Sequence, residues 1–207
     1  PNLQTPEQIF FAPLDSIPQD YIEHLTCRMQ DFFAEEGVET ALFPLGAGNH
    51  IDHRIMHAVG RRIKNMDVLY YEDRPYIIWP GILQGRFHDL KVQADLVEAK
   101  PEDMAETLGQ FTYHNLLPKG AFNEDALKKF QQMLNQPKNY TGKAKAAKKL
   151  EATEGELQKL YKALSYYTSQ MPLIFPTYEI FLQDSAAGED FRSGHRAYFE
   201  RYWSITG

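Results

Sequence analysis

The sequence predicts an α/β fold with a Rossmann-like parallel sheet and flanking helices. Between residues 19 and 71, patterns typical of helix, strand, helix and strand follow one another. Two strands joined by a helix normally lie parallel in one sheet, so residues 40–45 and 67–71 are expected to be parallel neighbours. Such a sheet usually contains more parallel strands than these two. The fold is therefore expected to be incomplete without an N-terminal part.

The first helix is predicted over residues 19–35, where apolar side chains recur at the spacing of one helical face. Gly37 is a plausible stop for it. The apolar strand 40–45 ends in a turn punctuated by glycines, which opens a second helix running to about Lys64.

The rest of the chain is predicted in coarser terms as part of a single α/β domain over residues 1–207, with a helical, aromatic-rich part from about 101 to 207. Thr153 and Glu156 form a capping-box pattern at the start of a late helix. The later aromatics are expected to pack in a core or in an oligomer contact. The other expected elements are a short strand at 8–13, a strand-like cover at 76–79, a hairpin-like excursion at 82–100, helices at 101–117 and 123–135, and a basic solvated loop or helix face at 138–149.

Composition limits the class of protein. The 207 residues are 43% hydrophobic and 24% charged, which is ordinary for a globular domain with one core. A net charge of −6 argues against a nucleic-acid partner, which would usually demand a basic face. The single cysteine, Cys27, cannot form an internal disulfide and is expected to be a small buried hydrophobe in a reducing compartment. No apolar run approaches the length of a membrane span, so a cytoplasmic protein is expected.

The turn after the 40–45 strand contains three proton-handling residues, His50, Asp52 and His53. Ligands of α/β folds bind outside the carboxyl ends of parallel strands, where this turn would lie. The spacing lets both imidazoles face one pocket without sharing a metal, and Asp52 could accept the N–H of His50 and set its tautomer. The alternative is that Asn49 or Asp52 caps the helix and the histidines are merely polar residues near its start. Spacing alone leaves these two interpretations equal.

Two further polar features belong to the same region. His57 follows His53 by four residues, which is a metal-ligand spacing, but a partly buried structural histidine is the favoured interpretation. Glu72 and Arg74 follow the 67–71 strand, where they could bind sugar hydroxyls. A solvated turn with a local ion pair explains them about as well.

Three segments together resemble the zinc-dependent de-N-acetylases of the PIG-L, or LmbE-like, family. Pro44 to Arg54, with its Gly-x-Gly-Asn-His-x-Asp-His-Arg core, is similar to the second signature motif of that family. Tyr70 to Tyr76 resembles the strand and turn that follow, and Lys162 to Gln170 resembles a late helix. The first family motif, His-Pro-Asp-Asp, does not occur in this chain. The chain is therefore interpreted as the C-terminal part of a family member whose N-terminal part is cleaved off, separately encoded or left out.

The resemblance implies a zinc-dependent hydrolase that removes an acetyl or other acyl group from an N-acetylated amino sugar or glycoconjugate. In that scheme, His53 is a zinc ligand, His50 stabilises the oxyanion, and Asp52 orients His50 and favours its protonated form. The N-terminal half or a second subunit would supply the remaining ligands and the base, and a homo-oligomer is expected. The alternative is a non-catalytic binding or assembly subunit, and a third hypothesis is an internal metal site of His53, His57 and a carboxylate. Candidate substrate-binding residues are Asn49, Arg54, Glu72 and Arg74.

Overall fold

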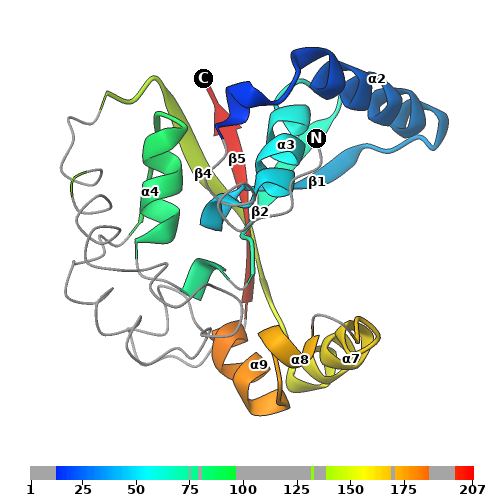
Figure 1. Cartoon of the computed structure of the whole chain (residues 1–207), viewed down its shortest axis with the longest axis vertical. Coiled ribbons are helices and arrows are strands. Elements are labelled where there is room, and N and C mark those ends of the chain that lie inside the picture. The colour runs from blue at the N-terminus through cyan, green and yellow to red at the C-terminus, as the bar shows by residue number, and fades with distance from the viewer. Residues whose placement is uncertain are drawn as a thin grey trace.

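The structure is a computed structural model, and it describes residues 13–74, 76–78, 81–96, 132, 139–168, 171–186 and 199–207. These residues form one sheet, helices packed on it, and a group of smaller helices at one end (Figure 1). The α-helices are α2 (Gln19–Glu35), α3 (Ile51–Gly60), α4 (Ile82–Asp89), α7 (Glu154–Leu164), α8 (Met171–Ile174) and α9 (Tyr178–Ala186). The strands are β1 (Thr40–Pro44), β2 (Asp67–Tyr71), β3 (Val92–Ala94), β4 (Gly142–Glu151) and β5 (Phe199–Thr206), and short 3-10 turns are η1 (Leu14–Ser16), η2 (Ala47–Asn49) and η3 (Tyr76–Ile78).

The sheet is mixed. Its strand order is β1-β2-β5-β4-β3. β1 and β2 are parallel, as predicted from the helix between them, and β3 and β4 are also parallel. β5 runs antiparallel to both β2 and β4, so the prediction of a parallel sheet holds for β1 and β2 and is wrong for the sheet as a whole. The cause is the last strand of the chain, which returns between β2 and β4.

One face of the sheet carries the main core. Tyr70 on β2 lies opposite Trp203 on β5, and residues paired in this way point to the same face. The ring of His57 from α3 packs 4.5 Å from Tyr70, and the ring of Phe87 from α4 packs 4.8 Å from Trp203. Helices α3 and α4 therefore cover the same face. The most deeply buried side chains of this cluster include Ile17, Ile22, Phe43, Leu45, Ile51, Val59 and Trp203.

A second, smaller core lies among α7, α8 and α9, which gather at the lower end of the long strands β4 and β5 in Figure 1. The predicted capping box begins α7, where the Thr153 hydroxyl accepts the Glu156 N–H at 3.3 Å and the Glu156 carboxylate accepts the Thr153 N–H at 2.8 Å. Phe175 and Phe181 are buried with edge-to-face rings 5.4 Å apart. The expected core packing of these aromatics is confirmed.

Several local predictions are wrong. Residues 142–151 form the strand β4, although a loop or helix face was expected there, and residues 82–94 contain α4 and β3 where a hairpin was expected. The expected cover at 76–79 is the 3-10 turn η3, and Cys27 is exposed on α2. The predicted helices at 101–117 and 123–135, residues 8–12 of the first expected strand, and the Ser169-Gln170 end of the late motif lie outside the described residues, apart from Gln132. Within the described ranges, no helix is both long enough and apolar enough to span a bilayer.

The end of β2 is joined to β5 by two ion pairs of different burial. Glu72 is 5% exposed, and its carboxylate accepts hydrogen bonds from Arg201 Nε and, at 2.8 Å, from Trp203 Nε1. Arg74 donates to Glu200 at 2.9 Å in a more accessible pair. Since a buried charge without its partner is costly, the first pair matters far more for folding than the second.

We therefore expect Glu72→Gln to lower the free energy of unfolding by roughly 3 kcal/mol or more, because it removes the buried carboxylate that pairs with the Arg201 guanidinium. Glu200→Gln is the matched control and should cost about 1 kcal/mol or less. Urea denaturation of the two variants measures both values. Equal destabilisation would show that burial does not distinguish the two pairs.

Candidate functional site

The loop between β1 and α3 is shaped by three residues in the left-handed region. Gly46 has φ +82°, Gly48 has φ +77° and Asn49 has φ +65°. Glycine adopts this conformation at no steric cost, and asparagine is one of the few other residues that adopt it readily. The loop therefore turns tightly from the carboxyl end of β1 into the first turn of α3, as its glycines predicted.

His50 is the N-cap of α3. Its Nδ1 accepts the backbone N–H of Asp52 at 3.3 Å. A neutral ring that accepts through Nδ1 carries its proton on Nε2. Burial and then the neighbouring His53 lower the pKa of His50, while Asp52 and Asp73 oppose this shift.

The relation between Asp52 and His50 differs from the expected one. The backbone N–H of Asp52 donates to His50, whereas the Asp52 carboxylate was expected to accept from it. The Asp52 carboxylate does favour the protonated form of His50, as predicted, but burial outweighs it and the pKa of His50 falls. Asp52 itself is exposed.

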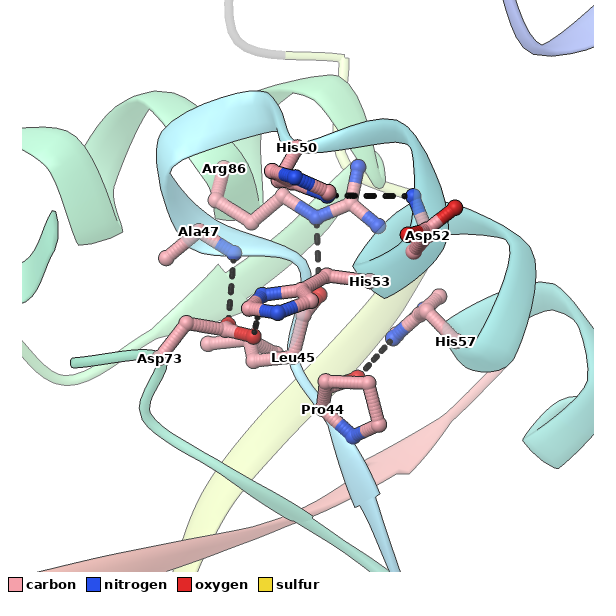
Figure 2. A network of polar contacts seen from close by, with 9 residues as sticks. All are labelled: Pro44, Leu45, Ala47, His50, Asp52, His53, His57, Asp73 and Arg86. Carbon is pink, nitrogen blue, oxygen red and sulfur yellow. Dashed lines mark hydrogen bonds and ion pairs between the residues drawn. The ribbon is translucent and has the colours of Figure 1, made fainter. Parts of the chain in front are cut away.

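His53 is held by a carboxylate that comes from the end of β2. The two atoms His53 Nδ1 and Asp73 Oδ1 lie 2.7 Å apart, and Asp73 Oδ2 accepts the backbone N–H of Ala47 at 2.8 Å. The Asp73 side chain has 0% exposure and the His53 side chain has 31%. Figure 2 shows how Asp73 reaches both the loop and the ring. Because Nδ1 is buried, the exposed part of the His53 ring lies on the side away from Asp73.

The rings of His50 and His53 are neighbours, with centroids 5.1 Å apart. Tyr76 closes one side, since its ring lies 6.0 Å from that of His53 and directly against the Cα of Gly48. Burial, and then the charge of Asp73, raise the pKa of Tyr76 to about 12, so its phenol stays neutral at ordinary pH. This arrangement brings together the two histidines whose spacing predicted a shared site.

His57 is a structural histidine. It is 3% exposed, and its Nδ1 lies 3.3 Å from the carbonyl oxygen of Pro44. Burial, and then the charge of Arg86, lower the pKa of His57 to about 3. Its Nε2 is buried and has no hydrogen-bond partner within the described ranges. In that part of the chain no group of three or more His, Cys, Asp or Glu side chains could hold a metal, so an internal site of His53, His57 and a carboxylate does not form there.

The other predicted residues divide into two groups. Asn49 and Arg54 lie in the loop and the first turn of α3, beside the histidines in the chain. Burial lowers the pKa of Arg54, against the opposing charges of Asp89 and Asp15. Glu72 and Arg74 instead pair with residues of β5, which favours the ion-pair interpretation of that turn.

Two important residues were missed. Asp73 lies between the predicted residues Glu72 and Arg74, and no local sequence pattern distinguishes it from them. Arg86 on α4 donates from Nε to the carbonyl oxygen of Leu45 at 2.9 Å, and its guanidinium lies against Gly46. A lone arginine in a stretch interpreted as a hairpin gave no signal for this contact.

Three comparisons with known proteins gave no match: none to a family model, none to a curated protein and none to a solved structure.

Replacement of Gly48 tests the shape of the loop. Gly48→Ala should lower the free energy of unfolding by about 2 kcal/mol or more, because alanine is strained at φ +77° and its Cβ would lie 2.1 Å from Tyr76 Cγ. Gly155→Ala, in the first turn of α7 with no atom within 4 Å of the new Cβ, should instead stabilise by up to about 1 kcal/mol. Chemical denaturation of the pair measures the difference, and a loss of stability in both variants would contradict it.

The low pKa of His57 predicts acid sensitivity. The pKa is about 3 in the folded protein and about 6.5 in the unfolded chain, so the stabilisation is complete above pH 6.5 and is lost as the pH falls toward 3. Between pH 6 and 5, His57→Asn should remove about 1.4 kcal/mol per pH unit from the slope of unfolding free energy against pH. His24→Asn, at an exposed position on α2, is the matched control for the loss of a histidine. An unaltered slope in the His57 variant would refute the assignment.

Proposed function

We propose that this chain is one part of a zinc-dependent hydrolase and contributes its active-site residues His50 and His53. The hydrolase would remove an acetyl or other acyl group from an N-acetylated amino sugar or glycoconjugate. The observation that carries the proposal is the contact between Asp73 and His53. A histidine that ligates a metal usually gives its other ring N–H to a carboxylate, which fixes the tautomer and the direction of the free nitrogen. Asp73 Oδ1 lies 2.7 Å from the buried Nδ1 of His53, which places a carboxylate at that nitrogen, and 31% of the His53 side chain stays exposed.

The described residues could supply one ligand of a catalytic metal ion but not the complete set. Catalytic zinc usually has three protein ligands, and His53 would be one of them. The described ranges contain no group of three donors, so the others would come from an N-terminal part or a second subunit, as the family resemblance implies. When bound, zinc polarises the amide carbonyl and lowers the pKa of its water from about 15.7 to about 7.

His50 would act as a neutral donor. Its Nδ1 accepts the Asp52 N–H, so the ring proton of the neutral imidazole is on Nε2. Burial keeps the imidazole neutral, and the N-terminus of α3 disfavours a positive charge in the same direction. A fixed N–H donor of this kind stabilises negative charge as it develops on a carbonyl oxygen.

The Rossmann-like part of the fold is proposed for β1, α3 and β2, with further parallel strands added beside β1. Among the described strands, β1 has a neighbour on one side only. Leu42 at its centre is 52% exposed, which is unusual for a leucine in the middle of a strand. An added N-terminal part that covers β1 would bury this side chain and bring its own ligands to the carboxyl ends of the strands.

The second candidate is a non-catalytic binding or assembly subunit. It is favoured by Glu72 and Arg74, which hold β5 and therefore leave fewer charged groups for a substrate. In this case Asp73 and His53 would serve only to fix the loop to α3. The two candidates differ in whether the assembled protein binds zinc.

Metal analysis of the protein purified from its native source, with all its polypeptides, separates the candidates. His53→Ala should abolish zinc binding, whereas His50→Ala should keep the zinc and slow deacetylation by roughly two to three powers of ten. His24→Ala is the control and should change neither. Equal zinc contents in the His50 and His53 variants would refute this division of roles, and a wild-type assembly without zinc would support the binding subunit.

A further inference from the structure

The second face of the sheet, the open face, carries solvent-accessible side chains in the part of the chain that the structure describes. Strand pairing places Pro44, Tyr71, Tyr202 and Lys148 in one row across β1, β2, β5 and β4. These residues alternate with Phe43, Tyr70 and Trp203, which are buried on the other face. Tyr71 and Tyr202 are partly exposed and Lys148 is exposed, whereas Pro44 is buried, so the row is accessible to solvent on β2, β5 and β4.

A β-bulge gives this face its third lysine. Lys143 and Lys145 lie on it opposite Thr206 and Ser204 of β5. With strict alternation Lys148 would turn to the core face, but the register shifts between Ala146 and Lys148. The shift places Lys148 opposite Tyr202 and leaves Ala146 against Trp203. All three lysines are exposed, and they form a row along β4.

The aromatic residues stand directly beside this row. Tyr71 and Tyr202 are paired across neighbouring strands, about 5 Å apart at the backbone. Burial and the neighbouring carboxylates of Asp73 and Glu200 raise the pKa values of Tyr71 and Tyr202, respectively, so both phenols stay neutral. The two neutral rings provide surfaces on which other aromatic groups can stack, and the row of lysines beside them attracts negatively charged groups.

We propose that this open face, defined by Tyr71, Tyr202, Lys143, Lys145 and Lys148, binds single-stranded nucleic acid. Proteins that bind single strands combine aromatic side chains, on which bases stack, with a basic track for the phosphates. A duplex would hide its base faces from the tyrosines, whereas an unpaired strand offers bases and phosphates together. The site is separate from the histidines and does not depend on the proposed hydrolase activity.

The net charge of −6 does not oppose a local basic face. Among the described strand residues, the acidic groups on the same side of the sheet are Asp67, at the start of β2, and Glu200, whose carboxylate is paired with Arg74. The lysine row itself contains no acidic residue between Lys143 and Lys149. The net charge of the whole chain therefore does not determine the local charge along β4.

Fluorescence anisotropy with labelled oligouridine and oligothymidine, on the whole chain, tests the proposal. The triple variant Lys143→Gln, Lys145→Gln, Lys148→Gln should weaken binding at least about tenfold. It should also reduce the slope of log affinity against log salt concentration by about 2, the value for three phosphate contacts on a single strand. The matched control carries Lys64→Gln, Lys159→Gln and Lys162→Gln, which make the same charge change at exposed positions elsewhere and should preserve affinity.

Tyr202 supplies the second test. Tyr202→Leu should weaken binding at least about fivefold, the lower limit for the loss of one stacked base, while Tyr202→Phe should bind like the wild type. Absence of saturable binding would overturn the proposal, as would equal losses in the two triple variants. Equal competition by duplex DNA or a sulfated polysaccharide, with no effect of Tyr202→Leu, would also overturn it, because it would show attraction for any polyanion.

Discussion

The buried carboxylate of Asp73 connects the parts of this structure that could carry chemistry. One oxygen faces Nδ1 of His53 at 2.7 Å, and the other accepts the N–H of Ala47 at 2.8 Å. A fully buried carboxylate is costly unless it is hydrogen-bonded or paired with a charge, and here the Ala47 N–H satisfies Oδ2 while Oδ1 has only the nearby His53 ring as an ion-pair partner. Asp73 thereby fixes the end of β2 to both the glycine loop and the first turn of α3, so the position of the two histidines depends on it.

This constraint gives the two histidines different roles. His53 turns its buried Nδ1 toward Asp73 while 31% of its side chain stays exposed, which suits a metal ligand. His50 uses Nδ1 as the cap of α3 and keeps a proton on Nε2, which suits a hydrogen-bond donor. His57, one turn further along α3, is buried in the core. The three histidines of this short segment therefore differ in the group that each contacts through Nδ1.

The sequence predicted what depends on neighbours in the chain. α2, β1, α3, β2 and the capping box of α7 follow from spacing and local turn chemistry, and the closeness of His50 and His53 follows from the turn. Asp73 could not be selected, because its partner Ala47 lies 26 residues away and nothing local marks the pairing. The partners of Glu72 on β5 are 129 and 131 residues away, and the insertion of β5 was unpredicted for the same reason. In β4, Lys143 to Ala146 alternate with the period of a strand, but a run rich in lysine and alanine is equally typical of a solvated loop or helix face.

The tautomers of His50 and His53 test this account most directly. Two-bond ¹H–¹⁵N correlation spectra of the ¹⁵N-labelled protein, recorded at a pH where both rings are neutral and assigned with the His50→Ala and His53→Ala variants, identify which nitrogen of each ring carries the proton. The account predicts opposite tautomers, with the proton on Nδ1 in His53 and on Nε2 in His50. The same tautomer in both rings, or a proton on Nε2 of His53, would contradict the role assigned to Asp73.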